Sequence, residues 1–188
     1  MLTRLIAALM VTLPLACAHQ VQAKRLTVEA ESEEFTAAAV EYREIWTEDG
    51  ARIVEILEQL TELRLESGPI TVIVYEGVSF SGFRDIPMRM RASYPYDTKR
   101  GTLVHEISHR LISELVPKKF EDHPLIFLFL YDAWVELWGR EFADSQVAIE
   151  SRRRGLFDYE GAWKTALELS AEERSIRWAE FRRKREQQ

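Results

Sequence analysis

The sequence predicts an α+β fold in which a small mixed sheet is followed by helices. Two observations carry this prediction. Short β-branched or alternating segments lie in the first half of the chain, and apolar residues recur at helical spacing in most of the second half. The 188 residues suffice for one domain with its own core, and no internal repeat or linker divides them. We therefore expect a single domain over residues 24–188.

The first 23 residues have the features of a signal peptide rather than of a folded segment. Arg4 precedes a run of about twelve mainly apolar residues, too short for a permanent membrane span. Cleavage after Ala23 would remove Cys17, the only cysteine in the chain. We expect a periplasmic or secreted protein with no stable membrane span. The alternative is a lipoprotein anchored at Cys17.

The segments before residue 70 predict one strand and two helices. Residues 25–30 form a short strand pattern, and apolar residues spaced three and four apart indicate a helix over residues 32–47. Asp49-Gly50 then predicts a break. A second amphipathic helix is expected over residues 51–65.

Two further strands are expected on either side of a glycine-containing loop. Residues 70–75 are a continuous, mainly β-branched run, typical of a strand buried on both faces. Residues 77–85 form the loop, and residues 88–93 alternate apolar and polar as a half-exposed strand does. These strands complete the predicted sheet.

Helices account for the rest of the chain. Asp97 or Thr98 can cap a helix that Pro117 ends. A long helix is expected from residue 125 to residue 149, and its first half, apolar nearly all round, should be the central buried helix. One or two amphipathic helices follow from residue 159.

The most informative motif is His105-Glu106-Ile107-Ser108-His109, on the helix ended by Pro117. Histidines four residues apart lie one turn above each other, so both imidazoles can bind one zinc ion. Glu106 lies beside that face and can act as a general base. Otherwise the two histidines are hydrogen-bonded polar residues of a core helix, which leaves an unexplained polar cluster in apolar surroundings.

A catalytic zinc needs a third protein ligand, for which an acidic residue on a following helix is expected. In the metzincins a glycine and a third histidine extend the motif, but Ile112 and Leu115 stand at those positions here. A cysteine ligand is also excluded, because the chain cleaved after Ala23 contains no cysteine. Glu136 is the first choice because it lies in an almost wholly apolar stretch; it could instead pair with Arg140. Asp132 is the second choice, as a ligand or as an acceptor that orients a histidine. Weaker candidates are Glu141 and His123.

The order of these segments resembles the gluzincins, the thermolysin-like zinc metallopeptidases, in a minimal form. The resemblance covers about residues 70–143 and is specific at the His-Glu-x-x-His motif. It implies that His105, His109 and Glu136 bind one zinc ion and that Glu106 is the general base. Arg140 stands where thermolysin-like enzymes place an aspartate after the ligand glutamate.

These expectations lead to zinc-dependent hydrolysis of peptide bonds, with a peptide or protein as substrate. The alternative is a non-catalytic exported binding or scaffold protein that retains the metal site. The net charge of −6 argues against nucleic acid as a partner, and the basic runs 152–154 and 182–185 are interpreted as solvated helix ends.

Strand 88–93 is the expected edge for an extended substrate. Arg89 and Arg91 on its exposed face are interpreted as solvated edge charges, or else as a preference for acidic substrates. A donor for the developing oxyanion is also expected. The candidates for it are Tyr94, Tyr96, His123 and Tyr131.

Overall fold

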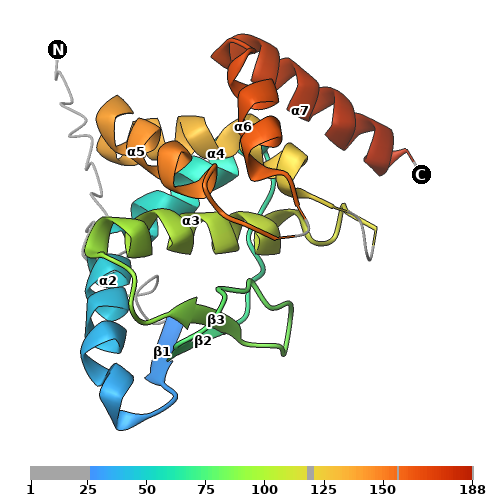
Figure 1. Cartoon of the computed structure of the whole chain (residues 1–188). Helices are drawn as coiled ribbons and strands as arrows, with labels where there is room; N and C mark the ends of the chain where they lie inside the picture. Colours follow the sequence, from blue (N-terminus) through green and yellow to red (C-terminus); the bar gives the residue numbers. More distant parts are fainter. Residues whose placement is uncertain (1–25, 118–120, 156, 188) are drawn as a thin grey trace, which may run out of the picture.

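A computed structural model describes residues 26–117, 121–155 and 157–187. Its strands β1 (Leu26–Ala30), β2 (Ile70–Tyr75) and β3 (Met88–Arg91) form one sheet in the order β1-β2-β3, and helices make up most of the remaining structure (Figure 1). The predicted α+β class is confirmed. The predicted signal peptide, residues 1–23, lies outside the described residues.

The sheet is parallel throughout, so the prediction of a mixed sheet is wrong. Val72 of β2 pairs with Val28 of β1 and with Met88 of β3, in parallel register on both sides. Parallel neighbours need a crossover of about a dozen residues or more. The helix between β1 and β2 provides one crossover, and the loop 76–87 provides the other.

Strand β2 has one buried face and one half-buried face, whereas the sequence predicts burial on both. Ile70, Val72 and Val74 belong to the core, and the residues that alternate with them remain partly exposed. Helices α2 (Thr36–Thr61) and α3 (Tyr96–Ile112) contact β1 and β3 respectively. Within the described residues, the helices therefore pack against the buried side of the sheet.

Helix α2 is continuous, so the predicted break at Asp49-Gly50 is wrong. A short 3-10 helix, η1 (Glu33–Phe35), precedes it. Gly50 is buried inside the helix, and a Cβ there would come within 2.7 Å of the Trp46 ring. Glycine is selected at this position by the space that the indole takes up, not by a turn.

The predicted helix over residues 125–149 is two helices, α4 (His123–Trp138) and α5 (Arg140–Glu150). They are separated by Gly139, whose φ is 88° and ψ is 167°. Only glycine adopts this region readily, because a Cβ would collide with the backbone. The chain changes direction there, which apolar periodicity alone does not reveal.

Helix α4 is the central helix, as its apolar sequence predicts. It contacts α2, α3, α5, α6 (Tyr159–Leu167) and α7 (Ala171–Glu186). Most of its residues from Ile126 to Leu137 are buried. Helix α7 begins with a capping box formed by Ser170 and Glu173.

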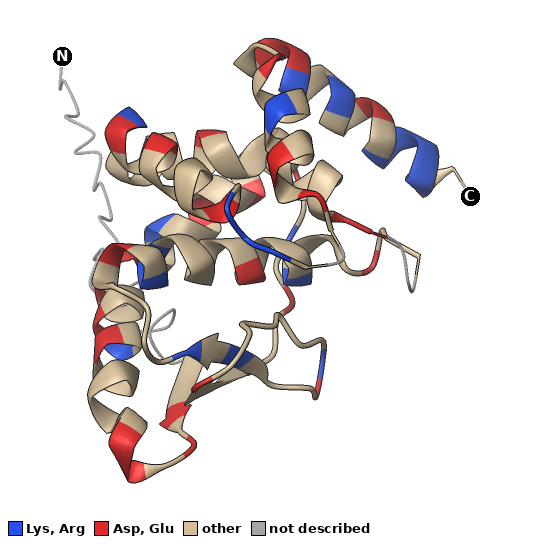
Figure 2. Cartoon of the chain, viewed as in Figure 1, with Lys and Arg blue, Asp and Glu red and all other residues tan. Residues whose placement is uncertain are grey.

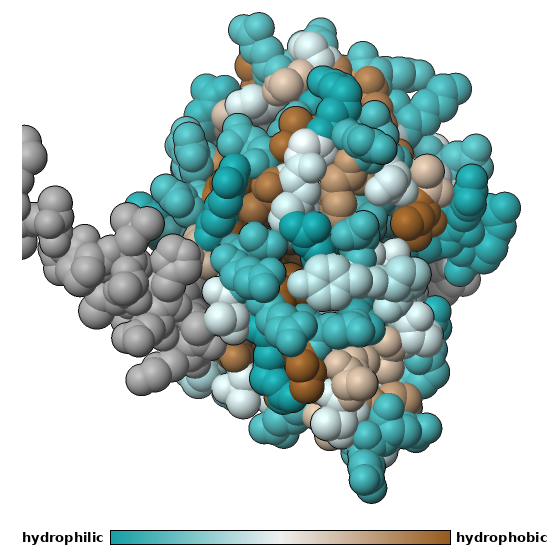
Figure 3. Space-filling view, turned by 90° about the vertical axis from the view of Figure 1, so that its left-hand side faces the viewer, coloured by the Kyte–Doolittle hydropathy of each residue, from teal (hydrophilic) through white to brown (hydrophobic). Residues whose placement is uncertain are grey.

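Charges and apolar side chains are unevenly distributed over the surface. Basic residues gather along the C-terminal half of α7 and on the segment that follows α5 (Figure 2). The face shown in Figure 3 is mostly hydrophilic, with apolar side chains in small separate groups. Among the described helices, none combines the length and the apolar character needed to cross a membrane.

Replacing Gly139 by alanine is expected to destabilise the protein by about 1–3 kcal/mol. The cause is backbone conformation alone, since a Cβ at Gly139 would meet no atom within 4 Å apart from those of Gly139 and its two chain neighbours. Chemical denaturation would measure the loss. Gly155→Ala is the matched control, because that position is equally open and its φ is not positive. Equal stability of the two variants would contradict the explanation of the helix break.

Candidate metal centre

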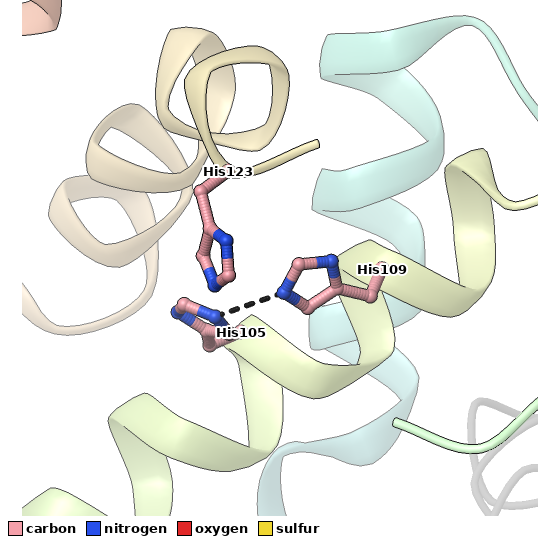
Figure 4. A group of neighbouring side chains, drawn as sticks. All are labelled: His105, His109 and His123. Carbon is pink, nitrogen blue, oxygen red and sulfur yellow. Dashed lines mark hydrogen bonds between the residues drawn. The ribbon is translucent and has the colours of Figure 1, made fainter. Parts of the chain in front are cut away.

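Three imidazoles meet where α3 and the start of α4 come together. His105 and His109 lie one turn apart on α3, and His123 is the first residue of α4 (Figure 4). Each offers a ring nitrogen within 4.8 Å of the other two. The Nε2 atoms of His105 and His109 are 3.1 Å apart, close to the roughly 3.4 Å between two ligands of a tetrahedral zinc ion. The three side chains therefore fit a metal ion.

A buried carboxylate on α5 lies behind His105. Nδ1 of His105 is 2.8 Å from Oε1 of Glu150, although that oxygen lies off the line of the ring N–H. The Trp163 indole donates to the other oxygen of Glu150 at 3.1 Å, and the Arg153 guanidinium lies 3.3 Å from Oε1. This contact leaves Nε2 of His105 facing the other histidines. Carboxylates behind ligand histidines commonly orient the ring and increase its basicity.

The other two histidines have the same arrangement. Nδ1 of His109 lies 2.9 Å from a carboxylate oxygen of Asp122, and Nδ1 of His123 contacts the carboxylate of Glu121. Phe157 stacks on the His123 ring with 4.5 Å between centroids. Each Nδ1 atom thus has a carboxylate beside it, so the Nε2 atoms are the candidate ligand atoms, although Nε2 of His123 contacts the Tyr159 hydroxyl.

Burial and ion pairing set the protonation of the His105–Glu150 pair. Burial lowers the pKa of His105 to about 3, and the neighbouring Glu150 charge only partly opposes this effect. Burial would raise the pKa of Glu150, but the charges of His105 and Arg153 hold it at about 2. Since His105 is neutral at pH 7, Arg153 is the cation that keeps Glu150 ionised there. The pair therefore presents a neutral imidazole to the site.

His109 differs from the other two histidines. Burial would lower its pKa, but the hydrogen bond and charge of Asp122, with the charge of Glu106, raise it above the ordinary value. The pKa of His123 is lowered by burial and by the charge of His109. Without metal, a protonated His109 can donate its Nε2–H to neutral His105. A metal ion bound by both rings would take the place of that proton.

Glu106 is buried beside the histidines, with 5% of its surface exposed. Burial raises the pKa of this carboxyl to about 7, although the charges of His109 and Arg153 oppose the shift. A carboxyl with a pKa near neutrality can both accept and release a proton at physiological pH. The geometry therefore allows Glu106 to act as a proton shuttle.

A cleft of about 510 Å³ opens onto this centre. Its rim on one side is the loop between β2 and β3, which is held by Arg110, the residue after His109. The buried Arg110 guanidinium pairs with Glu66 and donates to three carbonyl oxygens of the loop. The lining includes His105, Glu106, His109, Asp122, His123, Arg153, Arg154, Tyr159, Arg91, Tyr94 and residues 78–81.

The outer edge of β3 is not free for an extended substrate, as strand 88–93 was expected to be. Phe80 exchanges two backbone hydrogen bonds with Arg89, each of 2.8 Å. The Ser79 hydroxyl accepts from the Arg91 amide at 3.2 Å. The chain covers its own sheet edge with the loop that rims the cleft, and β3 itself ends at Arg91.

Glu136, the predicted third ligand, is not part of this group. It lies thirteen residues along α4 from His123, a rise of about 20 Å at about 1.5 Å per residue. Its side chain is exposed and borders a hollow that also includes Leu60 and Trp178. Glu136 is therefore too far away to share an ion with His105, whereas His123, a weaker candidate, lies within reach of both His105 and His109. No ion pair joins Glu136 to Arg140 within the described residues either.

The remaining candidates are mostly distant from the cleft. Asp132 forms a two-point ion pair with Arg174, at 2.9 Å and 2.5 Å. The Tyr131 hydroxyl donates to Asp144. Glu141 and Tyr96 are exposed and are not part of the cleft lining. Of the predicted oxyanion donors, Tyr94 lines the cleft, and His123 lies in the histidine group.

The sequence reasoning missed Tyr159 and the three carboxylates behind the imidazoles, Glu121, Asp122 and Glu150. The Tyr159 hydroxyl lies 2.9 Å from Nε2 of His123. Its pKa is raised chiefly by burial, so the phenol is protonated at neutral pH and donates this hydrogen bond. Neither Glu150 nor Tyr159 belongs to a motif. Both reach the site because α5 packs on α3 and α4 and because α6 packs on α4.

No protein-family model, no characterised protein and no solved structure matches the chain.

Separate substitutions of His123 and Glu136 distinguish the two candidates for the third zinc ligand. We expect His123→Phe to weaken zinc binding at least tenfold, because one of three imidazoles is lost. Glu136→Gln should leave the zinc affinity unchanged, since Glu136 lies about 20 Å from His123 along the helix axis. Competition with a chromogenic chelator measures both. Loss of zinc in the Glu136 variant alone would contradict the histidine triad.

Zinc affinity is expected to fall as pH decreases, by about tenfold per pH unit or more below the pKa of His109. The sign follows because binding must displace a proton from Nε2 of His109, whose pKa is raised. His105 competes little, since its pKa is about 3. Zinc titrations in buffers from pH 5 to pH 8 would test this. A pH-independent affinity would exclude His109 as a ligand.

Proposed function

We propose that this protein is a zinc-dependent hydrolase of peptide bonds, exported by its predicted signal peptide. The observation that carries the proposal is the convergence of His105, His109 and His123 beside the buried carboxyl of Glu106. Three nitrogen ligands with a neighbouring acid–base group in an open cleft are typical of catalytic rather than structural zinc sites. Structural sites usually have four closed ligands and need no general base.

The proposed ligand set departs from the gluzincin pattern that the sequence resembles. A histidine at the start of α4 takes the place of a glutamate further along that helix. It also differs from the extended metzincin motif, because the third histidine lies on a separate helix. The proposal is therefore a metallopeptidase with the His-Glu-x-x-His motif and a histidine as third ligand. The His-Glu-x-x-His motif supports this assignment. The resemblance to the gluzincins extends to this motif and not to the third ligand.

The residues of the cleft can divide the chemistry among themselves. When bound, zinc would supply Lewis-acid activation of water and of the substrate carbonyl. Glu106 accepts the proton of the attacking water, because its carboxyl lines the cleft beside the histidines. The same carboxyl can then deliver the proton to the departing amine. Asp122 and Glu150 hold two of the imidazoles in orientation throughout.

Tyr159 has two possible roles, which separate the proposal from its alternative. Its hydroxyl now donates to Nε2 of His123, and it would be released if that nitrogen bound a metal ion. It then lies beside the centre, where it can donate to the oxyanion that develops on the substrate. If it became a fourth ligand instead, the site would be closed. That arrangement would suit a non-catalytic binding or scaffold protein.

We expect Glu106→Gln to lower kcat for peptide hydrolysis by about 10² to 10⁴-fold, because the proton shuttle is lost. Zinc should remain at one equivalent, since Glu106 is not among the proposed ligands. Cleavage of a mixed peptide library followed by mass spectrometry, together with metal analysis, measures both effects. Glu160→Gln, an exposed change on α6, is the control.

The outcomes separate the two functions. One equivalent of zinc without cleavage by the wild-type protein would support the non-catalytic alternative. Tyr159→Phe then discriminates further: an oxyanion donor affects kcat while zinc is retained, whereas a fourth ligand affects zinc affinity. Protein without bound zinc under saturating metal would contradict both.

A further inference from the structure

The cleft that opens onto the histidines is lined by more cations than anions. Three arginines, Arg91, Arg153 and Arg154, line it with two carboxylates, Glu106 and Asp122. Two of these arginines pair with carboxylates outside the lining, so within the described residues Arg154 alone adds an unpaired positive charge. Asp122 is already held by His109. A bound divalent cation would make the cleft more positive still.

Arg153 is held next to the proposed metal ligands. Its guanidinium is 3.3 Å from Oε1 of Glu150, the same oxygen that contacts His105 at 2.8 Å. It also approaches the Thr102 hydroxyl at 3.4 Å and lies 5.6 Å from the centre of the Tyr159 ring. Its side chain is 21% exposed, and it borders the cleft. A fixed guanidinium with free donors is suited to two-point binding of a carboxylate.

Arg154 adds a second cation to the same wall. It is exposed, it lines the cleft, and among the described residues no ion pair involves it. Figure 2 shows the basic segment after α5 to which both arginines belong. Arg91 is less available, because its Nε donates to the Gly77 carbonyl and its guanidinium lies 3.3 Å from Glu76.

Another part of the cleft rim carries exposed apolar side chains. Val78 and Phe80, on the loop between β2 and β3, line the cleft and are 76% and 50% exposed. An extended ligand across the metal centre would therefore meet apolar side chains at one end and guanidinium groups at the other. This asymmetry would favour one orientation of a bound extended ligand over the reverse.

We infer that the substrate carries a carboxylate within one or two residues of the scissile bond, bound by Arg153 and Arg154. The inference rests on the proposed peptidase function and adds the substrate class. The carboxylate has two possible sources: the C-terminus of a peptide, or an aspartate or glutamate side chain. Both present the same planar pair of oxygens to a guanidinium.

Two sets of paired peptides distinguish the sources. One set compares a free C-terminus with its amide, and the other compares an internal aspartate or glutamate with asparagine or glutamine. We expect kcat/KM to be at least tenfold higher for the charged member of one set. Arg154→Gln and Arg153→Lys should each remove most of that preference. Arg152→Gln, an exposed neighbour outside the cleft lining, should preserve it.

Calorimetry with zinc-loaded Glu106→Gln protein supplies a readout that does not depend on turnover. Tighter binding of the charged peptides, lost in a second variant that also carries Arg154→Gln, supports the inference. Equal cleavage and equal binding of charged and neutral peptides would overturn it and leave the peptidase proposal standing. Charge-dependent binding without any hydrolysis would retain the arginine site and contradict the peptidase.

Discussion

The whole arrangement depends on the burial of α4. This helix contacts α2, α3, α5, α6 and α7, and most of its side chains from Ile126 onward are removed from water. Burial on that scale is the largest favourable term in folding, and it fixes where the helix begins as firmly as where its middle lies. Its first residue is His123. Hydrophobic packing of the helix thus positions a titratable imidazole, which itself stacks on Phe157.

The centre brings unfavourable groups into the same core. Imidazoles and carboxylates cost free energy when they leave water unless they are paired. Here the groups are paired: each of the three imidazoles has a carboxylate beside its Nδ1 atom, and the charge of Arg153 balances that of Glu150. The Nε2 atoms of His105 and His109 face each other at 3.1 Å, a contact in which one nitrogen must donate and the other accept. The proposed divalent cation would be bound by both nitrogens without a proton between them.

The sequence was informative where chemistry depends on local geometry. His105, Glu106 and His109 lie on one helix, so their spacing alone determines that they share a face. The sequence favours Glu136 over His123 because Glu136 lies in an almost wholly apolar stretch, where a carboxylate is expected to have a functional partner. That reasoning overlooked chain reversal: His109 lies near the end of α3, so the start of the next helix returns to it, not its middle. Asp122-His123-Pro124, at a helix start, was the available signal.

The fold was predictable to the same extent. Apolar periodicity located the strands and the central helix, but it could not distinguish the glycine that continues α2 from the glycine that ends α4. Gly50 fits under an indole, and Gly139 adopts a backbone conformation that other residues avoid. Glu150 and Tyr159 depend on these choices, because they reach the site through tertiary packing of separate helices.

Gly139 also influences residues that are distant from it in the sequence. The reversal at this residue brings α5 back against α3, and Glu150 at the end of α5 reaches His105. A residue without a side chain, remote from every histidine, therefore governs whether one imidazole has its carboxylate partner. In a genetic screen for lost function, position 139 should score together with the histidines, and its tolerance to change would report on the assembly of the centre rather than on its chemistry.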